Sequence, residues 1–306
     1  MNTGHALRLQ DVVKTYNGTT AVDHVSFEVP QGTIYGLLGP NGAGKTSLIR
    51  IITTITAADS GHIWLHGQPL NSSHPEQIGY MPEERGLYKK MKVGPQLLYL
   101  ARLKGLSAKE ARQKIQWWLE RFECTDWWPK KVEELSKGMQ QKIQFIATVV
   151  HEPKLLILDE PFSGLDPVNT NLIKDEIRRL RDQGTTIIFS THRMEQVEEV
   201  CEQITLINHG KNMLTGKVAD IKQQFKQHLY RIVYNGTLPP LLAQMPQERF
   251  RVIEQQAGEL LVQVADETIA HELLRLLIDH GLHIRLFQEV LPSLNEIFIR
   301  LVQNAE

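Results

Sequence analysis

The sequence is poor in cysteine and has no long apolar stretch, and each shortage excludes a class of protein. Its 306 residues include two cysteines, Cys124 and Cys201, which lie far apart and form no C-x-x-C pair. This excludes a thiol-based zinc site and is typical of a reducing cytoplasm. The longest apolar runs, such as "LLIL" and "IATVV", fall far short of the roughly 18 residues of a membrane span. The first residues, "MNTGHALRLQ", lack the pattern of a secretory signal, so we expect a chain that does not itself cross a bilayer.

An excess of charge of either sign is also missing. The chain has 34 lysines and arginines against 35 aspartates and glutamates, a net charge of −1. No global field therefore favours nucleic acid or an acidic membrane as a partner. The hydrophobic content of 42% and the charged content of 23% are ordinary for a soluble globular protein, and the length allows two domains.

The first two thirds of the chain alternate between strand and helix patterns. Residues 7–35 predict short strands, of which "IYGLLG" is apolar enough to be buried on both faces. A helix should follow from Lys45 to about Thr54. Two further buried strands, "KLLILDE" and "TTIIFSTH", each precede a helical pattern. Strands that alternate with helices predict an α/β fold with a right-handed, mostly parallel sheet.

Residues 93–150 are different and predict a helical subdomain, at about residues 90–150. "SAKEARQKIQWWLERF" starts with a capping box, Ser107 and Glu110, and its apolar residues recur at helical spacing. Trp118 falls on this apolar stripe and is expected in the core. Trp117 and the turn "TDWWPKK" lie off the stripe, so they could pack within the subdomain or against a partner helix. A second helix is expected at roughly 137–150.

The pattern changes again after about residue 226. "YRIVYNG" predicts a strand, "PPLLAQM" a short helix, and "RFRVIEQQAGELLVQVAD" a hairpin. "ETIAHELLRLLIDHG" predicts a helix with Asp266 as its N-cap and Gly281 just past its end. "HIRLFQEV" and "SLNEIFIRLVQ" predict a last strand and helix. This order is that of a split βαβ unit, a small α+β ferredoxin-like domain. We therefore expect two domains, residues 1–225 and 226–306.

The stretch "GPNGAGKTS" carries the strongest chemical signal. It fits G-x4-G-K-[ST] and stands between a buried strand and a helix start, where a phosphate-binding P-loop must lie. Glycines let backbone N–H groups curl around phosphate oxygens, and the helix N-terminus adds partial positive charge. Lys45 would reach the β and γ phosphates, and the Thr46 hydroxyl would bind Mg²⁺. A chance glycine turn is the alternative. The predicted nucleotide contacts here are Gly39, Pro40, Asn41, Gly42, Ala43, Gly44, Lys45, Thr46 and Ser47.

Two carboxylates end the strand "LLILDE". Asp159 emerges at the carboxyl end of this strand, where ligands bind in open α/β sheets, and would hold Mg²⁺. Glu160 could polarise the attacking water. An apolar strand that ends in "DE" is common, and by itself it would indicate nothing more than a pair of carboxylates at the end of a strand. The P-loop upstream makes the catalytic interpretation the better one.

The stretch "LSKGMQQK" precedes the second helix of the helical subdomain. Ser136 has the character of an N-cap, and Gly138 would expose backbone N–H groups in the first turn. This is either a second anion site or a plain helix cap, and on its own the cap is the simpler interpretation.

Taken together, these motifs make the sequence similar to the ATP-binding subunits of ABC transporters, over roughly residues 5–225. "LSKGMQQK" resembles the family signature, "SGLD" (residues 163–166) its D-loop and "STH" its switch histidine. Tyr16 stands at the position whose ring stacks on adenine. The resemblance implies a dimer in which ATP lies between the P-loop of one subunit and Ser136 and Gly138 of the other. Glu160 would be the general base, and His192 would contact the γ-phosphate.

The sequence departs from the family pattern at two places. Lys137 and Met139 replace the third and fifth residues of the usual LSGGQ signature. Glu83, in "GYMPEERGLY", stands where relatives commonly carry a glutamine that touches Mg²⁺ or the attacking water. Its charge would either strengthen Mg²⁺ coordination or push the side chain onto Arg85 or a permease residue. Glu84 is expected to be a solvated loop residue. Three lysines nearby, at residues 89, 90 and 92, form a small basic patch that is either solvated or close to a bilayer.

The resemblance implies a peripheral ATPase subunit at the cytoplasmic face of the plasma membrane, with ATP and Mg²⁺ as cofactors. It would dimerise, most simply as a homodimer, and drive a separate integral-membrane permease. The C-terminal region, with "LPSLNEIFIRL", resembles an export-type subfamily that includes sodium-extrusion and drug-resistance transporters. Neither nucleic acid nor a periplasmic binding protein is implied.

The alternatives to a transporter subunit are a soluble ABC-type ATPase that acts on ribosomes or DNA, and a small-molecule kinase. A single P-loop, no sustained heptads and no basic face disfavour the first, and the signature and D-loop disfavour the second.

Overall fold

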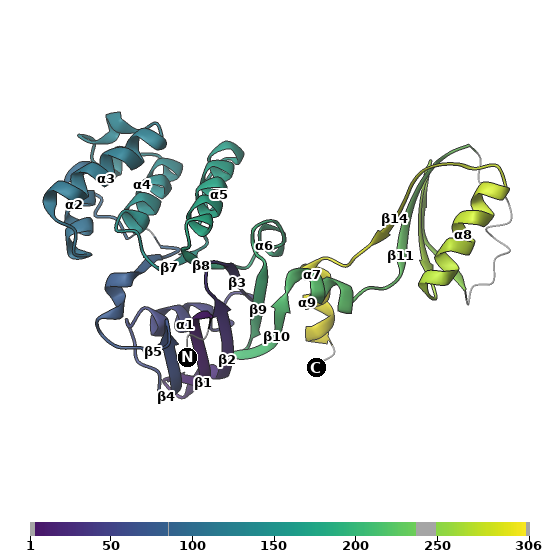
Figure 1. Cartoon of the computed structure of the whole chain (residues 1–306), viewed down its shortest axis with the longest axis horizontal. Helices are drawn as coiled ribbons and strands as arrows, with labels where there is room; N and C mark the ends of the chain where they lie inside the picture. Colours follow the sequence, from purple (N-terminus) through teal and green to yellow (C-terminus); the bar gives the residue numbers. More distant parts are fainter. Residues whose placement is uncertain (1–3, 85, 237–248, 304–306) are drawn as a thin grey trace. The chain divides into compact units, whose positions relative to one another are not determined.

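The computed structural model describes residues 4–84, 86–236 and 249–303. The chain forms two compact units, Met1–Val218 and Ala219–Glu306 (Figure 1). Each unit has its own sheet structure and its own apolar core. Within the described ranges, no helix combines the length and the apolar character that a membrane crossing requires.

A six-stranded sheet forms the centre of the larger unit, with strand order β10-β9-β3-β8-β7-β6. Only β10 is antiparallel to its neighbour, and the other five strands are parallel. Every residue of β3, β7 and β8 is buried, as their continuous apolar sequences predict. The strands are β3 (Ile34–Leu38), β6 (Ile78–Met81), β7 (Leu155–Asp159), β8 (Thr186–Thr191), β9 (Gln203–Asn208) and β10 (Lys211–Lys217).

Helices follow three of these strands, which confirms the alternating pattern. They are α1 (Lys45–Ile52) after β3, α5 (Pro167–Asp182) after β7 and α6 (Met194–Val200) after β8. Because β3, β7 and β8 are parallel neighbours, their carboxyl ends meet at one edge of the sheet.

A second, antiparallel sheet of the larger unit packs its apolar residues against the same core as α1. Its strand order is β2-β1-β4-β5. The strands are β1 (His5–Tyr16), β2 (Thr19–Pro30), β4 (Ser60–Leu65) and β5 (Gln68–Pro69).

Three helices form the predicted helical part of the larger unit: α2 (Val93–Leu103), α3 (Ala108–Arg121) and α4 (Lys137–Val149). The capping box at the start of α3 is confirmed, since Ser107 and Glu110 satisfy each other's backbone N–H groups. Trp118 is only 5% exposed and packs on Phe122 and Phe145, as the apolar stripe predicted. Trp128 packs within the same part, because a Cβ atom on Gly94 of α2 would meet its ring at 2.2 Å.

The smaller unit is built on a four-stranded antiparallel sheet with the order β12-β13-β11-β14. If the four strands are numbered 1 to 4 in the order in which they occur in the chain, their order in the sheet is 2-3-1-4, which is that of the predicted ferredoxin-like fold. Asp266 caps α8 by accepting from Ile269 N–H at 3.0 Å, as predicted. The predicted short helix at residues 239–245 lies outside the described residues. The elements are α7 (Val218–Gln224), β11 (Leu229–Asn235), β12 (Phe250–Gln256), β13 (Glu259–Val264), α8 (Glu267–Asp279), β14 (His283–Val290) and α9 (Leu294–Gln303).

Candidate active site

The loop between β3 and α1 forms a cradle of backbone N–H groups. Gly39 and Gly44 have φ angles of +149° and +105°, which favour glycine strongly. A side chain would not fit at either position, because a Cβ atom would lie 2.1 Å from Ile207 O or 2.2 Å from Ala21 O. The loop therefore wraps tightly around the start of α1, whose free N–H groups and dipole favour an anion.

Lys45 begins α1 and its ammonium group turns back over the loop. Its Nζ donates to Gly39 O at 2.7 Å and to Pro40 O at 3.0 Å. Burial lowers the pKa of Lys45, while the carboxylates of Asp159, Glu160 and Glu83 act in the opposite direction. A positive charge is thus held beside the cradle and faces three acidic groups.

The two carboxylates at the carboxyl end of β7, Asp159 and Glu160, are held by residues at the end of the neighbouring strand β8 and just after it. Ser190 Oγ donates to Asp159 Oδ1 at 2.7 Å. Thr191 Oγ1 donates to Glu160 Oε2 at 3.0 Å, and the backbone N–H of His192 donates to Glu160 Oε1 at 2.8 Å. The same Oε1 lies 2.6 Å from His192 Nδ1. Both carboxylates and the histidine are therefore fixed in orientation by hydrogen bonds.

A cavity of about 280 Å³ joins the loop to these carboxylates. Glu83, from the loop after β6, lines it together with Asp159 and Glu160. Burial raises the pKa of Asp159, and the nearby charges of Glu83 and Glu160 raise it further. Three carboxylates at one end of a phosphate cradle form a site with excess negative charge, which a divalent cation would neutralise. The remaining lining residues are Ala21, Asn41, Gly42, Ala43, Gly44, Lys45, Thr46 and Ser47.

The donors in this cavity fit the cofactors that the sequence predicts. Backbone N–H groups, Lys45 and a helix N-terminus are the groups that hold nucleotide phosphates. The Thr46 hydroxyl and the carboxylates of Asp159 and Glu83 are hard oxygen ligands, which suit Mg²⁺.

The predicted signature residues lie apart from this cavity. Ser136 caps α4 by accepting from Met139 N–H at 3.2 Å, so the cap interpretation is confirmed as far as it goes. Ser136 is also exposed. Gly138 lies against the D-loop, because a Cβ atom there would meet Gly164 O at 3.5 Å. Neither Ser136 nor Gly138 lines the cavity beside the P-loop of its own chain.

Tyr16 likewise does not line the cavity. It ends β1, its side chain is 38% exposed, and the Nζ atom of Lys14 lies 5.4 Å from its ring centre. The ring is thus available for stacking, which stays a prediction. Arg85, a predicted alternative partner of Glu83, lies outside the described residues.

Four polar side chains support the site without having been singled out in the sequence. Ser190 and Thr191 hold the two carboxylates, as described above. Gln141 donates to Pro161 O at 2.9 Å and Gln144 donates to Pro82 O at 2.8 Å, so α4 is tied to the loops that carry Glu160 and Glu83. The available signal was the motif itself, since Gln141 stands within "LSKGMQQK" and both Ser190 and Thr191 within "STH".

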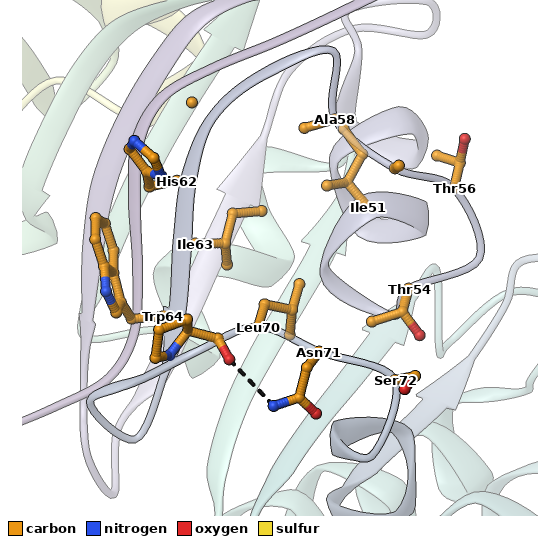
Figure 2. Close-up of a pocket in the computed structure, with 13 residues that line it drawn as sticks. Ile51, Thr54, Thr56, Ala58, His62, Ile63, Trp64, Leu70, Asn71 and Ser72 are labelled. Atoms are coloured by element: carbon orange, nitrogen blue, oxygen red, sulfur yellow. Dashed lines mark hydrogen bonds between the residues drawn. The ribbon is translucent and has the colours of Figure 1, made fainter.

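A second cavity, of about 580 Å³, is distinct from this site. It lies between α1 and the antiparallel sheet, and Figure 2 shows Ile51, Ile63 and Leu70 around it, with Trp64 and His62 at one side. Its lining is mostly apolar and includes no residue of the P-loop or of the acidic group.

The fold and the cavity define a P-loop nucleotide-binding protein: a parallel sheet, a glycine loop at a helix start and acidic side chains at the carboxyl ends of adjacent strands. Comparison with known proteins identifies the family within this class. A family model described as ABC transporter matches residues 22–163, and one described as ATP-binding protein DrrA1-3-like, C-terminal domain, matches residues 216–302.

Individual relatives agree with both matches. The chain is 46% identical over 296 residues to the ABC transporter ATP-binding protein YhaQ of Bacillus subtilis (strain 168), covering 97% of this chain and 98% of the relative. It is 31% identical over 267 residues to the daunorubicin/doxorubicin resistance ATP-binding protein DrrA of Streptomyces peucetius, covering 86% and 79%. A solved ATP-binding subunit of an ABC transporter superposes with a TM-score of 0.68 at 29% identity, covering 72% of this chain and 93% of that one. The chain belongs to the ATP-binding subunits of ABC transporters, and the predicted ATPase domain is confirmed.

Proposed function

We propose that this chain hydrolyses ATP as a dimer to power export of a substrate through a separate membrane permease. The observation that carries the proposal is the convergence of the P-loop, Asp159, Glu160 and His192 at one sheet edge. Membership in the family supplies the transporter context. Export is supported by the DrrA-like match over residues 216–302 and by the names of relatives such as a Nod factor export ATP-binding protein of Rhizobium sp. (strain N33).

The geometry supports a division of roles within the site. The P-loop N–H groups and Lys45 bind and orient the phosphates. Mg²⁺ would be held by Thr46, Asp159 and Glu83, and it would neutralise negative charge on the phosphates. Glu160 takes a proton from the attacking water, and its two engaged oxygens fix its direction. His192 is positioned by Glu160 and reports on the γ-phosphate.

The positions of Ser136 and Gly138 support a sandwich of two copies. Both belong to the first turn of α4 or its cap, where N–H groups suit an anion, yet neither faces the P-loop of the same chain. A second copy that presents its own Ser136 and Gly138 would complete each nucleotide site. Because one chain carries every motif, a homodimer is sufficient.

A groove on the larger unit suits a permease segment. A cavity of about 450 Å³ lies between the loop after β6 and the helices α2 and α4. Two apolar side chains that line this groove, Leu103 and Ile55, are each 63% exposed. They form an apolar surface that no described residue covers. We assign this groove to the permease, which would place the chain at the cytoplasmic face of the membrane. We propose that residues 226–306 form an accessory domain, because they lie almost entirely within the stretch of residues 216–302 that matches a family model of its own.

Co-purification from membranes tests this proposal. The tagged chain should recover an integral-membrane protein, and Leu103→Glu should lower the recovered amount by at least about tenfold, because it places a charge in an apolar contact. ATPase activity of the isolated variant should be unchanged, because Leu103 lies outside the nucleotide cavity. Ile278→Glu is the matched control, since Ile278 is 55% exposed on α8 of the smaller unit. Equal recovery with Leu103→Glu and the unmodified chain would refute the assignment.

A further inference from the structure

Three elements of the smaller unit converge on a group of potential metal ligands. Pairing of β11 with β14 sets Leu229 opposite Val290 and Tyr230 opposite Glu289. His228 therefore lies just before β11, beside the end of β14. Its carbonyl oxygen accepts from Val264 N–H at 3.0 Å, which brings in the end of β13 and the start of α8. One ligand atom from each of His228, Glu267 and Glu289 lies within 4.8 Å of the others.

Two of these atoms are shielded from solvent and have no hydrogen-bond partner among the described residues. They are His228 Nδ1 and Glu289 Oε1. They face each other at 3.7 Å, which is too long for a direct hydrogen bond. A buried nitrogen and a buried carboxylate oxygen that approach each other without a hydrogen bond to any described residue are costly to maintain, so we expect a group between them that satisfies both at once.

We propose that His228, Glu267 and Glu289 form a binding site for a divalent transition-metal ion, with Zn²⁺ as the best fit. Zinc accepts one imidazole nitrogen and carboxylate oxygens at about 2.0–2.1 Å, so its tetrahedral ligands lie roughly 3.3 Å apart. The 3.7 Å separation of Nδ1 and Oε1 is close to this value, and small side-chain rotations bring in Glu267, which is exposed. Water would fill the fourth position. The imidazole ligand disfavours Mg²⁺ and Ca²⁺, which prefer all-oxygen sites.

Lys226 competes with the metal for one ligand. Lys226 precedes His228 by two residues, and its ammonium group contacts Glu267 Oε1. A metal that binds Glu267 must displace this ammonium or use the second carboxylate oxygen. Removal of the lysine charge should therefore strengthen metal binding.

The site would fasten the segment before β11 to α8 and β14 within the smaller unit. It is distinct from the nucleotide cavity, none of whose lining residues it shares. A metal that binds the folded chain more tightly than the unfolded one raises its thermal stability, so the effect should be visible without any assay of ATP hydrolysis.

Titration of the full-length chain with Co²⁺, a spectroscopic substitute for Zn²⁺, tests the proposal. The protein is first treated with EDTA and dialysed, and excess Mg²⁺ is then kept present to occupy the all-oxygen site beside the P-loop. We expect one Co²⁺ per chain with the visible absorption of a tetrahedral nitrogen and oxygen site, and competition by Zn²⁺. His228→Ala should weaken binding by at least about tenfold, and Lys226→Gln should tighten it. His283→Ala, an exposed histidine of β14, is the matched control and should leave binding unchanged.

Glu289→Gln keeps the shape of the side chain and removes its negative charge. It therefore gives a second test if His228→Ala fails to fold. Saturable binding that both variants weaken, together with a zinc-dependent rise in melting temperature that they abolish, supports the site. The proposal is overturned if the unmodified chain shows no saturable binding. It is also overturned if His228→Ala or Glu289→Gln, folded, binds as tightly as the unmodified chain, because the ion is then held elsewhere.

Discussion

The Glu160 carboxylate is fixed against His192. Oxygen Oε1 accepts the His192 backbone N–H at 2.8 Å and lies 2.6 Å from Nδ1, while Thr191 holds Oε2 at 3.0 Å. The residue that we propose as general base is therefore coupled directly to the residue that we propose to report on the γ-phosphate. Movement of the His192 ring toward a phosphate would remove the Nδ1 contact from Oε1 but leave the backbone hydrogen bond in place, so a change at the His192 side chain should also alter the surroundings of the Glu160 carboxylate.

Lys45→Ala should lower the rate of ATP hydrolysis to a very small fraction of that of the unmodified chain. Among the described residues that line the nucleotide cavity, Lys45 is the only lysine. Loss of a preorganised group that stabilises developing charge typically costs about 10²–10³ in rate. Turnover is measured as phosphate release at saturating ATP. Lys109→Ala, on the exposed surface of α3, is the control and should be as active as the unmodified chain. Normal turnover with Lys45→Ala would remove Lys45 from the mechanism.

Glu83→Gln should change the Mg²⁺ dependence of ATP hydrolysis. Glu83 shares the cavity with Asp159, and its charge acts on both Asp159 and Lys45. A neutral amide is a weaker ligand than a carboxylate, so half-maximal activity should require several-fold more Mg²⁺. Glu84→Gln should show the unmodified dependence, because Glu84 does not line the cavity. Identical Mg²⁺ curves for Glu83→Gln and the unmodified chain would argue against a metal role for Glu83.

The two adjacent tryptophans of α3 should contribute differently to stability. Trp118 is 5% exposed and packs in the aromatic core, whereas Trp117 is 45% exposed and lies beneath the guanidinium groups of Arg121 and Arg179. Trp118→Ala should lower the free energy of unfolding by about 3–5 kcal/mol through the cavity that it leaves. Trp117→Ala should cost less than about 2 kcal/mol, mainly through lost cation–π contact. Urea unfolding of both variants measures the difference, and equal losses would contradict the assigned packing.

His151 should make the fold sensitive to acid. Burial lowers the pKa of His151 to about 4, with a smaller effect from the charge of Lys104. As the pH falls below about 6.5, His151 takes up a proton in the unfolded chain but not in the folded chain. The contribution of His151 to the free energy of unfolding is therefore complete above that pH and is lost below it. It should fall by up to about 3 kcal/mol as the pH drops from 6.5 to 4. Chemical unfolding at several pH values should show a flatter profile for His151→Phe than for the control His283→Gln. Parallel profiles would mean that His151 titrates normally.

The sequence predicted the nucleotide loop and the acidic strand end well because both depend on local patterns. Gly39 and Gly44 are required by the backbone of a short loop, and the burial of β3 and β7 follows from their continuous apolar residues. The ferredoxin-like fold of the smaller unit was also predicted from the order of its elements along the chain, and the observed strand order agrees with it.

Contacts between distant segments were not predictable in this way. The hydrogen bond from Ser190 to Asp159 depends on the register between β7 and β8, which no local pattern specifies. The approach of His228 to Glu289 joins residues that are 61 positions apart, as their numbers show, and it depends on the pairing of β11 with β14. Tyr16 was assigned by position in a motif, and its contact with adenine stays a prediction.

The most direct test of the account is the oligomeric state of Glu160→Gln with ATP. The amide cannot accept a proton from water, so this variant should bind ATP, turn it over very slowly and keep the nucleotide between two copies. Light scattering coupled to size exclusion should show a dimer with MgATP and a monomer with MgADP, while Glu195→Gln, on α6, behaves as the unmodified chain. A monomer at saturating MgATP would contradict the proposal that two copies of this chain enclose the nucleotide.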